Sequence, residues 1–236
     1  MSAPMSVVSE AVRFSSGEWT LVGVLHRPGD STLEARSSNL EPRTSNLEHL
    51  RPAVAICHPH PLYGGDMENN VVVSLCGALA DAGVAALRFN FRGVGGSGGS
   101  HGGGIGERQD ARAALDFLAG LPEVDGGRLG LAGYSFGGLV ALTAADERIR
   151  ALVAVSPPSG ALDAASCRPG IPTLLVSGDE DDIAPAARLP EMAASLGPAC
   201  EVRSVAGADH FWWGREEALA TTVIEFFRDR LPASEP

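Results

Sequence analysis

The chain has 236 residues, of which 44% are hydrophobic and 20% are charged, and 18 Lys and Arg against 29 Asp and Glu give it a net charge of -11. This composition excludes disorder of the whole chain, and the length suffices for a core that needs neither disulfide nor metal. The negative charge disfavours binding to nucleic acid and to anionic membrane surfaces.

The chain carries no sign of export or membrane insertion. Its four cysteines show no paired spacing, and its first ten residues lack the basic and apolar regions of a secretory signal. No apolar run approaches the ~18 residues that span a bilayer. We therefore expect a cytoplasmic protein with free thiols.

The first predicted element is an antiparallel hairpin at a sheet edge, with strands at Val7–Phe14 and Trp19–His26. Residues 28–51 are polar and lack periodicity, so we expect a surface insertion within a single domain of residues 1–236. Buried strands are expected at Ala53–Cys57, Val84–Phe89, Arg128–Ala132, Leu152–Val155, Thr173–Val176 and Glu201–Val205. Helices are expected at Asn70–Ala82, Glu107–Ala119, Phe136–Ala145, Ala186–Leu196 and Arg215–Arg230.

The alternation of short apolar strands with helices predicts an α/β fold whose parallel sheet is covered by helices on both faces. Such sheets place their chemistry beyond the carboxyl ends of the strands. Residues directly after each strand are therefore the candidates for a site. The glycine-rich residues 93–106 lack the lysine of a P-loop, so we expect them to form a structural loop.

A nucleophile is predicted at Ser135, within Gly133-Tyr134-Ser135-Phe136-Gly137. The pattern alone is common, but here it joins an expected strand to an expected helix, where a serine is presented on a sharp turn. Such a turn crowds its neighbours, which explains glycines two positions before and after. The helix directs its positive end toward a developing anion. The alternative is that these residues only cap the N-terminus of the helix and pack tightly, with no catalytic role.

The base that activates Ser135 is expected at His210. Where a G-x-S-x-G turn presents the serine, the acid and then the histidine follow it in the chain, and His210 is the one histidine after Ser135. His210 lies in a loop after the strand Glu201–Val205, so a surface histidine is the alternative.

An acid that orients the His210 ring is expected among the four carboxylates of residues 179–182, which follow another strand. The spacing from Gly178 to Pro185 favours Asp181, and Asp179 is the second candidate.

An oxyanion hole is expected from two backbone N–H groups, those of Phe136 and His60. His60 lies in His58-Pro59-His60-Pro61, where the prolines lack an N–H and hold His60 extended. A metal site at His58 and His60 is the alternative, but no third ligand is near in the sequence. We expect neither a metal nor another cofactor.

Apolar and aromatic side chains near these positions are expected to line a substrate pocket, namely Leu62, Tyr63, Tyr134, Phe211 and Trp212. Packing beneath the last helix is an equal alternative for Trp212. The loop at residues 156–170 is too short for a helical cap. We therefore expect an open site for acyl chains of about two to six carbons, because each buried methylene adds only ~0.8 kcal/mol.

Taken together, these motifs resemble the α/β-hydrolase superfamily, and within it the small lidless bacterial serine hydrolases with an HPHP loop, which are dienelactone-hydrolase-like. The resemblance runs from about residue 53 to residue 231. It implies a mostly parallel twisted sheet of about eight strands, helices on both faces and no cap domain. It also implies a triad of Ser135, Asp181 and His210, with His60 and Phe136 as oxyanion donors.

The expected function is hydrolysis of carboxylic esters through an acyl-enzyme. The same triad serves amides, thioesters, lactones and peptides, so these substrates stay open, and a binding protein without turnover is a further alternative. The expected partner is a small-molecule ester, with no nucleic acid or membrane partner. The chain is expected to be a monomer or a homodimer.

Overall fold

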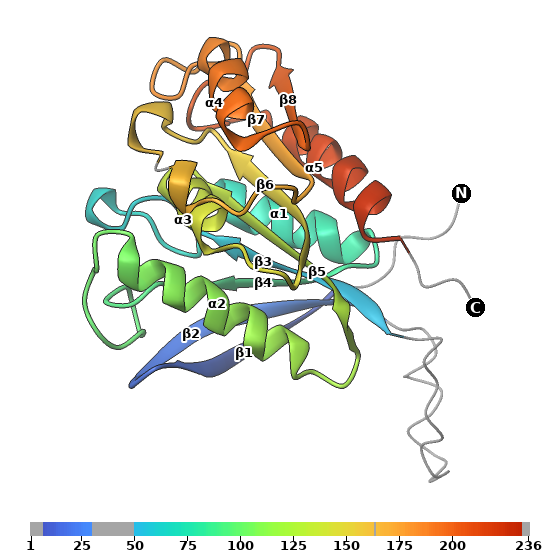
Figure 1. Ribbon diagram of the computed structural model, residues 1–236. Coiled ribbons are helices and arrows are strands. Elements are labelled where there is room, and N and C mark those ends of the chain that lie inside the picture. The colour runs from blue at the N-terminus through green and yellow to red at the C-terminus, as the bar shows by residue number, and fades with distance from the viewer. Residues whose placement is uncertain (1–6, 30–49, 163, 233–236) are drawn as a thin grey trace, which may run out of the picture.

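The computed structural model describes residues 7–29, 50–162 and 164–232, and a sheet in the order β1-β2-β4-β3-β5-β6-β7-β8 forms its centre (Figure 1). The pairs β1–β2 and β2–β4 are antiparallel, and all other neighbours are parallel. This confirms the mostly parallel sheet with a hairpin at its edge. The strands are β1 (Val7–Ser16), β2 (Trp19–Pro28), β3 (Arg51–Cys57), β4 (Ala85–Phe89), β5 (Val124–Tyr134), β6 (Ile149–Val155), β7 (Thr173–Gly178) and β8 (Cys200–Val205).

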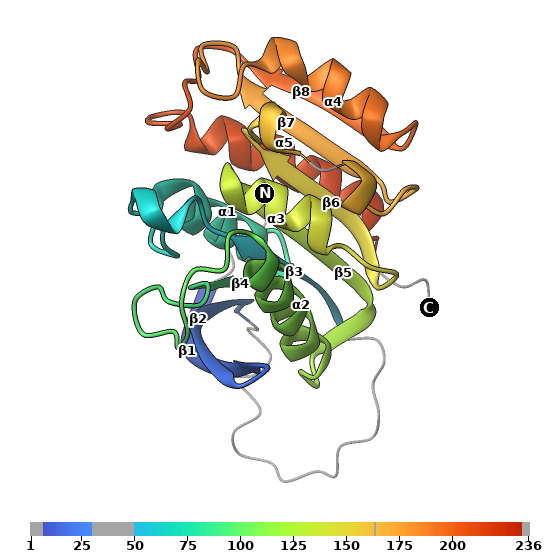
Figure 2. The same cartoon turned by 60° about the vertical axis from the view of Figure 1, so that its left-hand side comes forward.

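Helices cover both faces of the sheet, as the alternation predicts. Figures 1 and 2 show α2, α3 and α4 on one face and α1 and α5 on the other. Their bounds are α1 (Asn70–Asp81), α2 (Ile105–Ala119), α3 (Phe136–Ala144), α4 (Leu189–Leu196) and α5 (Glu216–Arg230). No helix within the described ranges is both long enough and apolar enough to cross a bilayer.

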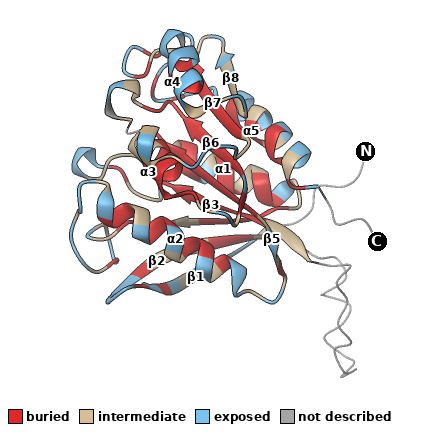
Figure 3. Ribbon diagram, in the orientation of Figure 1, coloured by how far each residue is buried: buried red, intermediate tan, exposed pale blue. Residues whose placement is uncertain are grey.

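Two hydrophobic cores lie between the sheet and its helices. Alternate residues of β3 belong to different cores. Ala53 and Ala55 lie in the core with α2, α3 and α4, whereas Val54 and Ile56 lie in the core with α1 and α5. Successive side chains of a strand point to opposite faces, so a strand buried on both sides needs a continuous apolar run. Figure 3 shows this burial along the central strands.

The structure differs from the prediction at the start of one helix. The helix predicted at Ala186–Leu196 begins with a 3-10 turn at Ala186–Arg188, and α4 starts only at Leu189. Pro190 explains this boundary, because a proline has no N–H and fits only the first turn of an α-helix. Of the insertion predicted at residues 28–51, residues 30–49 lie outside the described residues.

Candidate active site

Ser135 lies on a sharp turn between β5 and α3, with φ 54° and ψ -118°. L-residues rarely adopt such a conformation, and it concentrates at functional sites. A Cβ atom at Gly133 would lie 2.1 Å from the carbonyl oxygen of Gly137, and one at Gly137 would lie 2.3 Å from that of Cys57. Backbone contacts therefore explain both glycines of the motif.

Gly133→Ala is expected to destabilise the fold by about 3 kcal/mol or more, because the backbone atoms that its Cβ meets cannot move aside. Gly77→Ala is the matched control: nothing lies within 4 Å of its Cβ position in the middle of α1. Alanine there is expected to raise stability by roughly 0.5–1 kcal/mol. Urea unfolding measures both changes, and equal stabilities of the two variants would contradict the steric account.

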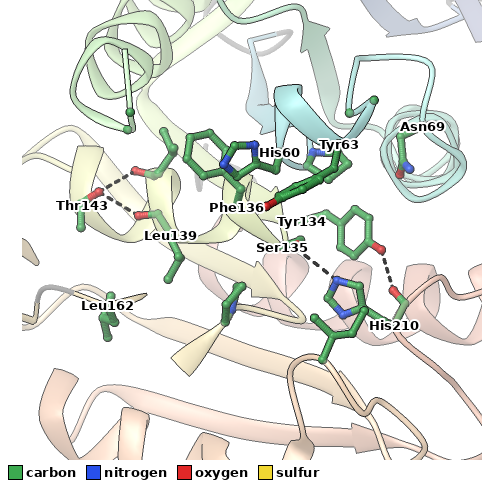
Figure 4. A pocket seen from close by; sticks show the side chains of 18 of the residues that line it. His60, Tyr63, Asn69, Tyr134, Ser135, Phe136, Leu139, Thr143, Leu162 and His210 are labelled. Atoms are coloured by element: carbon green, nitrogen blue, oxygen red, sulfur yellow. Dashed lines mark hydrogen bonds between the residues drawn. The ribbon is translucent and has the colours of Figure 1, made fainter. Parts of the chain in front are cut away.

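A continuous chain of contacts links Ser135 to a buried acid. The Nε2 atom of His210 lies 3.2 Å from the Oγ atom of Ser135, and its Nδ1 atom lies 3.0 and 2.9 Å from the two carboxylate oxygens of Asp181. An ionised carboxylate only accepts hydrogen bonds, so Nδ1 carries the ring proton and Nε2 is left to accept the serine proton. Figure 4 shows Ser135 and His210 facing each other across this contact.

Backbone N–H groups also bind the carboxylate of Asp181, in addition to His210. Its Oδ1 atom accepts hydrogen bonds from the backbone N–H groups of Ile183 at 3.0 Å and Ala184 at 2.7 Å. Burial alone would raise the pKa of Asp181, but the bonds from His210 and Ala184 outweigh it and lower the pKa to about 2. The second candidate, Asp179, instead accepts the N–H of Gly207 at 2.7 Å.

The low pKa of Asp181 predicts a pH dependence of stability. Because the folded pKa of about 2 lies below the ordinary 3.8, the carboxylate stabilises the fold above about pH 4, and this contribution is lost as the pH falls toward 2. The shift corresponds to about 2 kcal/mol. Urea unfolding of wild type and Asp181→Asn from pH 5 to pH 2 checks it, since the stability difference should shrink over this window. A constant difference would contradict the prediction.

A row of buried, hydrogen-bonded side chains connects Trp212 to Asp181. The indole N–H of Trp212 donates to the Oγ atom of Ser156 at 3.1 Å, and Ser156 Oγ lies 3.5 Å from Ser177 Oγ. Ser177 Oγ in turn lies 3.1 Å from a carboxylate oxygen of Asp181 and 2.6 Å from the carbonyl oxygen of Ala184, and its one hydrogen serves one of them at a time. Ser156 and Trp212 both have positive φ, at 45° and 64°. Residues with strained backbone, Ser156 and Trp212, therefore lie in the same hydrogen-bonded row as Asp181.

His60 and Phe136, whose backbone N–H groups are expected as oxyanion donors, both line the same cavity as Ser135. His60 is extended, with φ -61° and ψ 122°, as its flanking prolines predict. In the described part of the chain, neither N–H has a hydrogen-bond acceptor. Both groups are thus free to bind a negatively charged oxygen.

His58 is a structural histidine. Its Nδ1–H donates to the carbonyl oxygen of Pro59 at 2.7 Å, and its Nε2 accepts the N–H of Phe91 at 3.1 Å. Burial lowers the pKa of His58 to about 4, so the ring is neutral. Both ring nitrogens are occupied, which leaves none to bind a metal together with His60. Among the described residues, no group of three or more His, Cys, Asp or Glu could hold a metal ion.

Ser135 and His210 open onto a cavity of about 890 Å³. Of the five residues expected to line it, Tyr63, Tyr134 and Phe211 do so, and the hydroxyl of Tyr134 donates to the carbonyl oxygen of His210 at 2.6 Å. Leu62 does not line the cavity, and its side chain is 71% exposed. Figure 4 shows Tyr63 and Tyr134 near Ser135, and we refer to their side of the cavity as its first wall.

For Trp212 the pocket prediction is corrected, because its side chain is wholly buried in the core with α5 and does not line the cavity. The reason is the indole N–H, which needs a partner when buried and finds one in Ser156. The alternative of packing beneath the last helix describes this residue correctly.

The sequence analysis missed the opposite wall of the cavity. It is formed by side chains of α2, α3 and the loop after β6, namely Arg108, Leu139, Val140, Thr143 and Leu162. The glycine-rich segment reaches this wall through Gly103 and Gly104, while Arg92, directly before the segment, is bound to Asp110 at 2.8 Å. The amphipathic pattern of α2 and α3 contained no signal for this wall, because it marks their buried faces without showing which residues flank a cavity.

Comparison with known proteins identifies the family of the chain. Residues 25–181 match the family described as X-Pro dipeptidyl-peptidase (S15 family). An uncharacterized protein of Rickettsia prowazekii is 34% identical over 74% of this chain and 78% of its own length. Bis(hydroxyethyl) terephthalate hydrolase of Streptomyces coelicolor is 42% identical over 32% of this chain and 26% of its own length.

A solved structure shows the same fold at nearly full length. It is an α/β serine hydrolase without a lid from Xanthomonas campestris, 30% identical, with a TM-score of 0.79 over 96% of this chain and 97% of its own. In the present chain, the described residues between β6 and β7 form only two short 3-10 helices, Ser159–Ala161 and Ala164–Ser166. The chain is therefore a small α/β serine hydrolase without a lid, and it belongs to the family described as X-Pro dipeptidyl-peptidase (S15).

Proposed function

We propose that this hydrolase cleaves carboxylic esters of short acyl chains through an acyl-enzyme formed on Ser135. The observation that supports it most is the chain of contacts from Ser135 through His210 to Asp181 at the cavity. In the proposed first step, Ser135 Oγ attacks the carbonyl carbon while Nε2 of His210 accepts its proton. Asp181 stabilises the imidazolium that results.

The negative charge that develops on the carbonyl oxygen is assigned to the backbone N–H groups of His60 and Phe136. When the intermediate collapses, His210 returns the proton to the alcohol oxygen, which leaves. Water then attacks the acyl-enzyme while His210 accepts its proton, and His210 gives this proton to Ser135 Oγ as the bond to the acyl group breaks, which releases the carboxylic acid. Apart from the ester and water, these steps use only side chains and backbone groups of this chain.

Ester hydrolysis is favoured over release of dipeptides, although the family description names a peptidase. A dipeptidyl-peptidase must bind the ammonium group at the peptide's N-terminus, and a carboxylate is the usual counter-ion for such a group. No Asp or Glu occurs among the described residues that line the cavity. A relative over 32% of this chain is named as a hydrolase of an ester, bis(hydroxyethyl) terephthalate.

The preference for short acyl chains follows from the open site. The described residues between β6 and β7 form only two short 3-10 helices, so nothing there covers the distal methylenes of a long acyl chain, and these stay in water. Each methylene that stays in water forgoes ~0.8 kcal/mol of binding.

A panel of substrates tests the proposal. We expect hydrolysis of 4-nitrophenyl acetate, butyrate and hexanoate, with no further gain for dodecanoate, and a burst of nitrophenol before steady turnover if deacylation is the slower step. Alanyl-proline 4-nitroanilide is expected to be cleaved far more slowly. Faster cleavage of the nitroanilide than of butyrate would favour the peptidase instead, and rates that keep rising with chain length would contradict the short-acyl preference.

A further inference from the structure

Charge is distributed unequally between the cavity and the rest of the chain. The net charge of the chain is -11, yet the described residues that line the cavity include Arg108 and no Asp or Glu. The other titratable groups there are His60, Tyr63, Tyr134 and His210. The cavity thus offers an anionic substrate a fixed positive charge in an otherwise acidic protein.

The guanidinium of Arg108 is free to bind a ligand. Its backbone N–H donates to the carbonyl oxygen of Gly104 within α2, but its side chain has no hydrogen bond or ion pair with any described residue. The neighbouring acid, Glu107, is buried and engaged elsewhere: it accepts the N–H groups of Gly102 and Gly104 at 2.8 and 2.7 Å and lies 3.0 Å from Nδ1 of His101. It therefore does not neutralise Arg108 by pairing with it.

Arg108 lies on the part of α2 that packs beside α3. Arg112, one helical turn further along α2, donates to the carbonyl oxygen of Ala144 at the end of α3, at 3.1 Å. Arg108 is on the same face of α2, one turn nearer to its N-terminus. Since both Arg108 and Val140 line the cavity, Arg108 belongs to the wall that α3 forms beyond Ser135.

The proposed chemistry decides which half of an ester occupies this wall. His210 must protonate the departing alcohol, so the alcohol half lies beside His210. The acyl half then extends away from His210, and in Figure 4 Leu139, Thr143 and Leu162 lie on that side of Ser135. An acyl chain there contacts apolar side chains in the same cavity that Arg108 lines.

We propose that Arg108 determines substrate specificity by binding a carboxylate at the far end of the acyl group, so that the preferred substrates are monoesters of short aliphatic dicarboxylic acids. A guanidinium forms two parallel hydrogen bonds with a carboxylate, which makes it more selective than a point charge. The proposal rests on the proposed ester hydrolysis and names the substrate class of the same site.

A pair of matched esters tests the inference: the mono-4-nitrophenyl ester of adipic acid and 4-nitrophenyl hexanoate, which differ by a terminal carboxylate in place of a methyl group. Wild type is expected to have the higher kcat/KM for the adipate ester, and added salt should reduce this preference because it screens the charge. Arg108→Gln is expected to lower the ratio of kcat/KM for the adipate ester to kcat/KM for hexanoate about 10- to 100-fold.

Two further variants make the result specific. Arg108→Lys keeps the positive charge and is expected to restore part of the preference. Arg13→Gln, on the edge strand β1, removes the same charge away from the cavity and is expected to change neither ester. Loss of preference in Arg13→Gln, or an unchanged preference in Arg108→Gln, overturns the inference while ester hydrolysis stands. Failure of wild type to cleave either ester overturns the proposed function and this inference with it.

Discussion

Asp181→Asn is expected to lower kcat/KM for a short-chain ester about ten-thousandfold. The amide retains an oxygen for the N–H groups of Ile183 and Ala184, so the loop is expected to stay in place. Its NH₂ group, however, donates toward Nδ1 of His210 and thereby favours the tautomer with the proton on Nε2. A protonated Nε2 cannot accept the proton of Ser135.

Asp179→Asn is the matched control, two residues away in the same acidic loop. Asp179 accepts the N–H of Gly207, and an asparagine oxygen does the same, so we expect less than about a tenfold change. Steady-state kinetics of both variants with 4-nitrophenyl butyrate compare the two acids directly. Equal losses in the two variants would show that general charge in the loop matters, and would contradict the assignment of Asp181.

His210→Ala is expected to reduce kcat by about a hundred-thousandfold or more, and Ser135→Ala by a similar factor. Because the two residues act in one proton transfer, the double variant is expected to be no slower than either single variant. The residual rate would come from the backbone donors of the oxyanion hole, which both substitutions leave intact. Losses that multiply in the double variant would show that Ser135 and His210 act independently.

The elements of the fold could be predicted because each depends on local patterns. Continuous apolar runs mark strands buried on two faces, and the predicted parallel strands lie within β3 to β8 or differ by one residue at an end. The turn at Ser135 was predictable for a similar reason. Its sequence pattern is local, and the contact that requires Gly133 lies within the same turn, whereas Gly137 is required by its approach to Cys57 at the end of β3.

The supports of the site could not be predicted from local pattern. Trp212 adopts φ 64°, a conformation that no sequence rule assigns to tryptophan, and this backbone accompanies an indole in the core, bound to Ser156. Ser156 directly follows β6 and Ser177 lies near the end of β7, but only the pairing of β6 with β7 brings their hydroxyl groups together. Arg108 is likewise an ordinary helical arginine until the packing of α2 beside α3 places it at the cavity.

Labelling with a fluorophosphonate probe tests the central claim most directly, because the probe requires an activated serine and no knowledge of the substrate. The account predicts that one probe molecule bonds to Ser135 Oγ with loss of fluoride, that mass spectrometry locates it on the peptide containing Ser135, and that Ser135→Ala is not labelled. Wild type that stays unlabelled while correctly folded, or labelling that persists in Ser135→Ala, would contradict it and leave a binding role for the cavity.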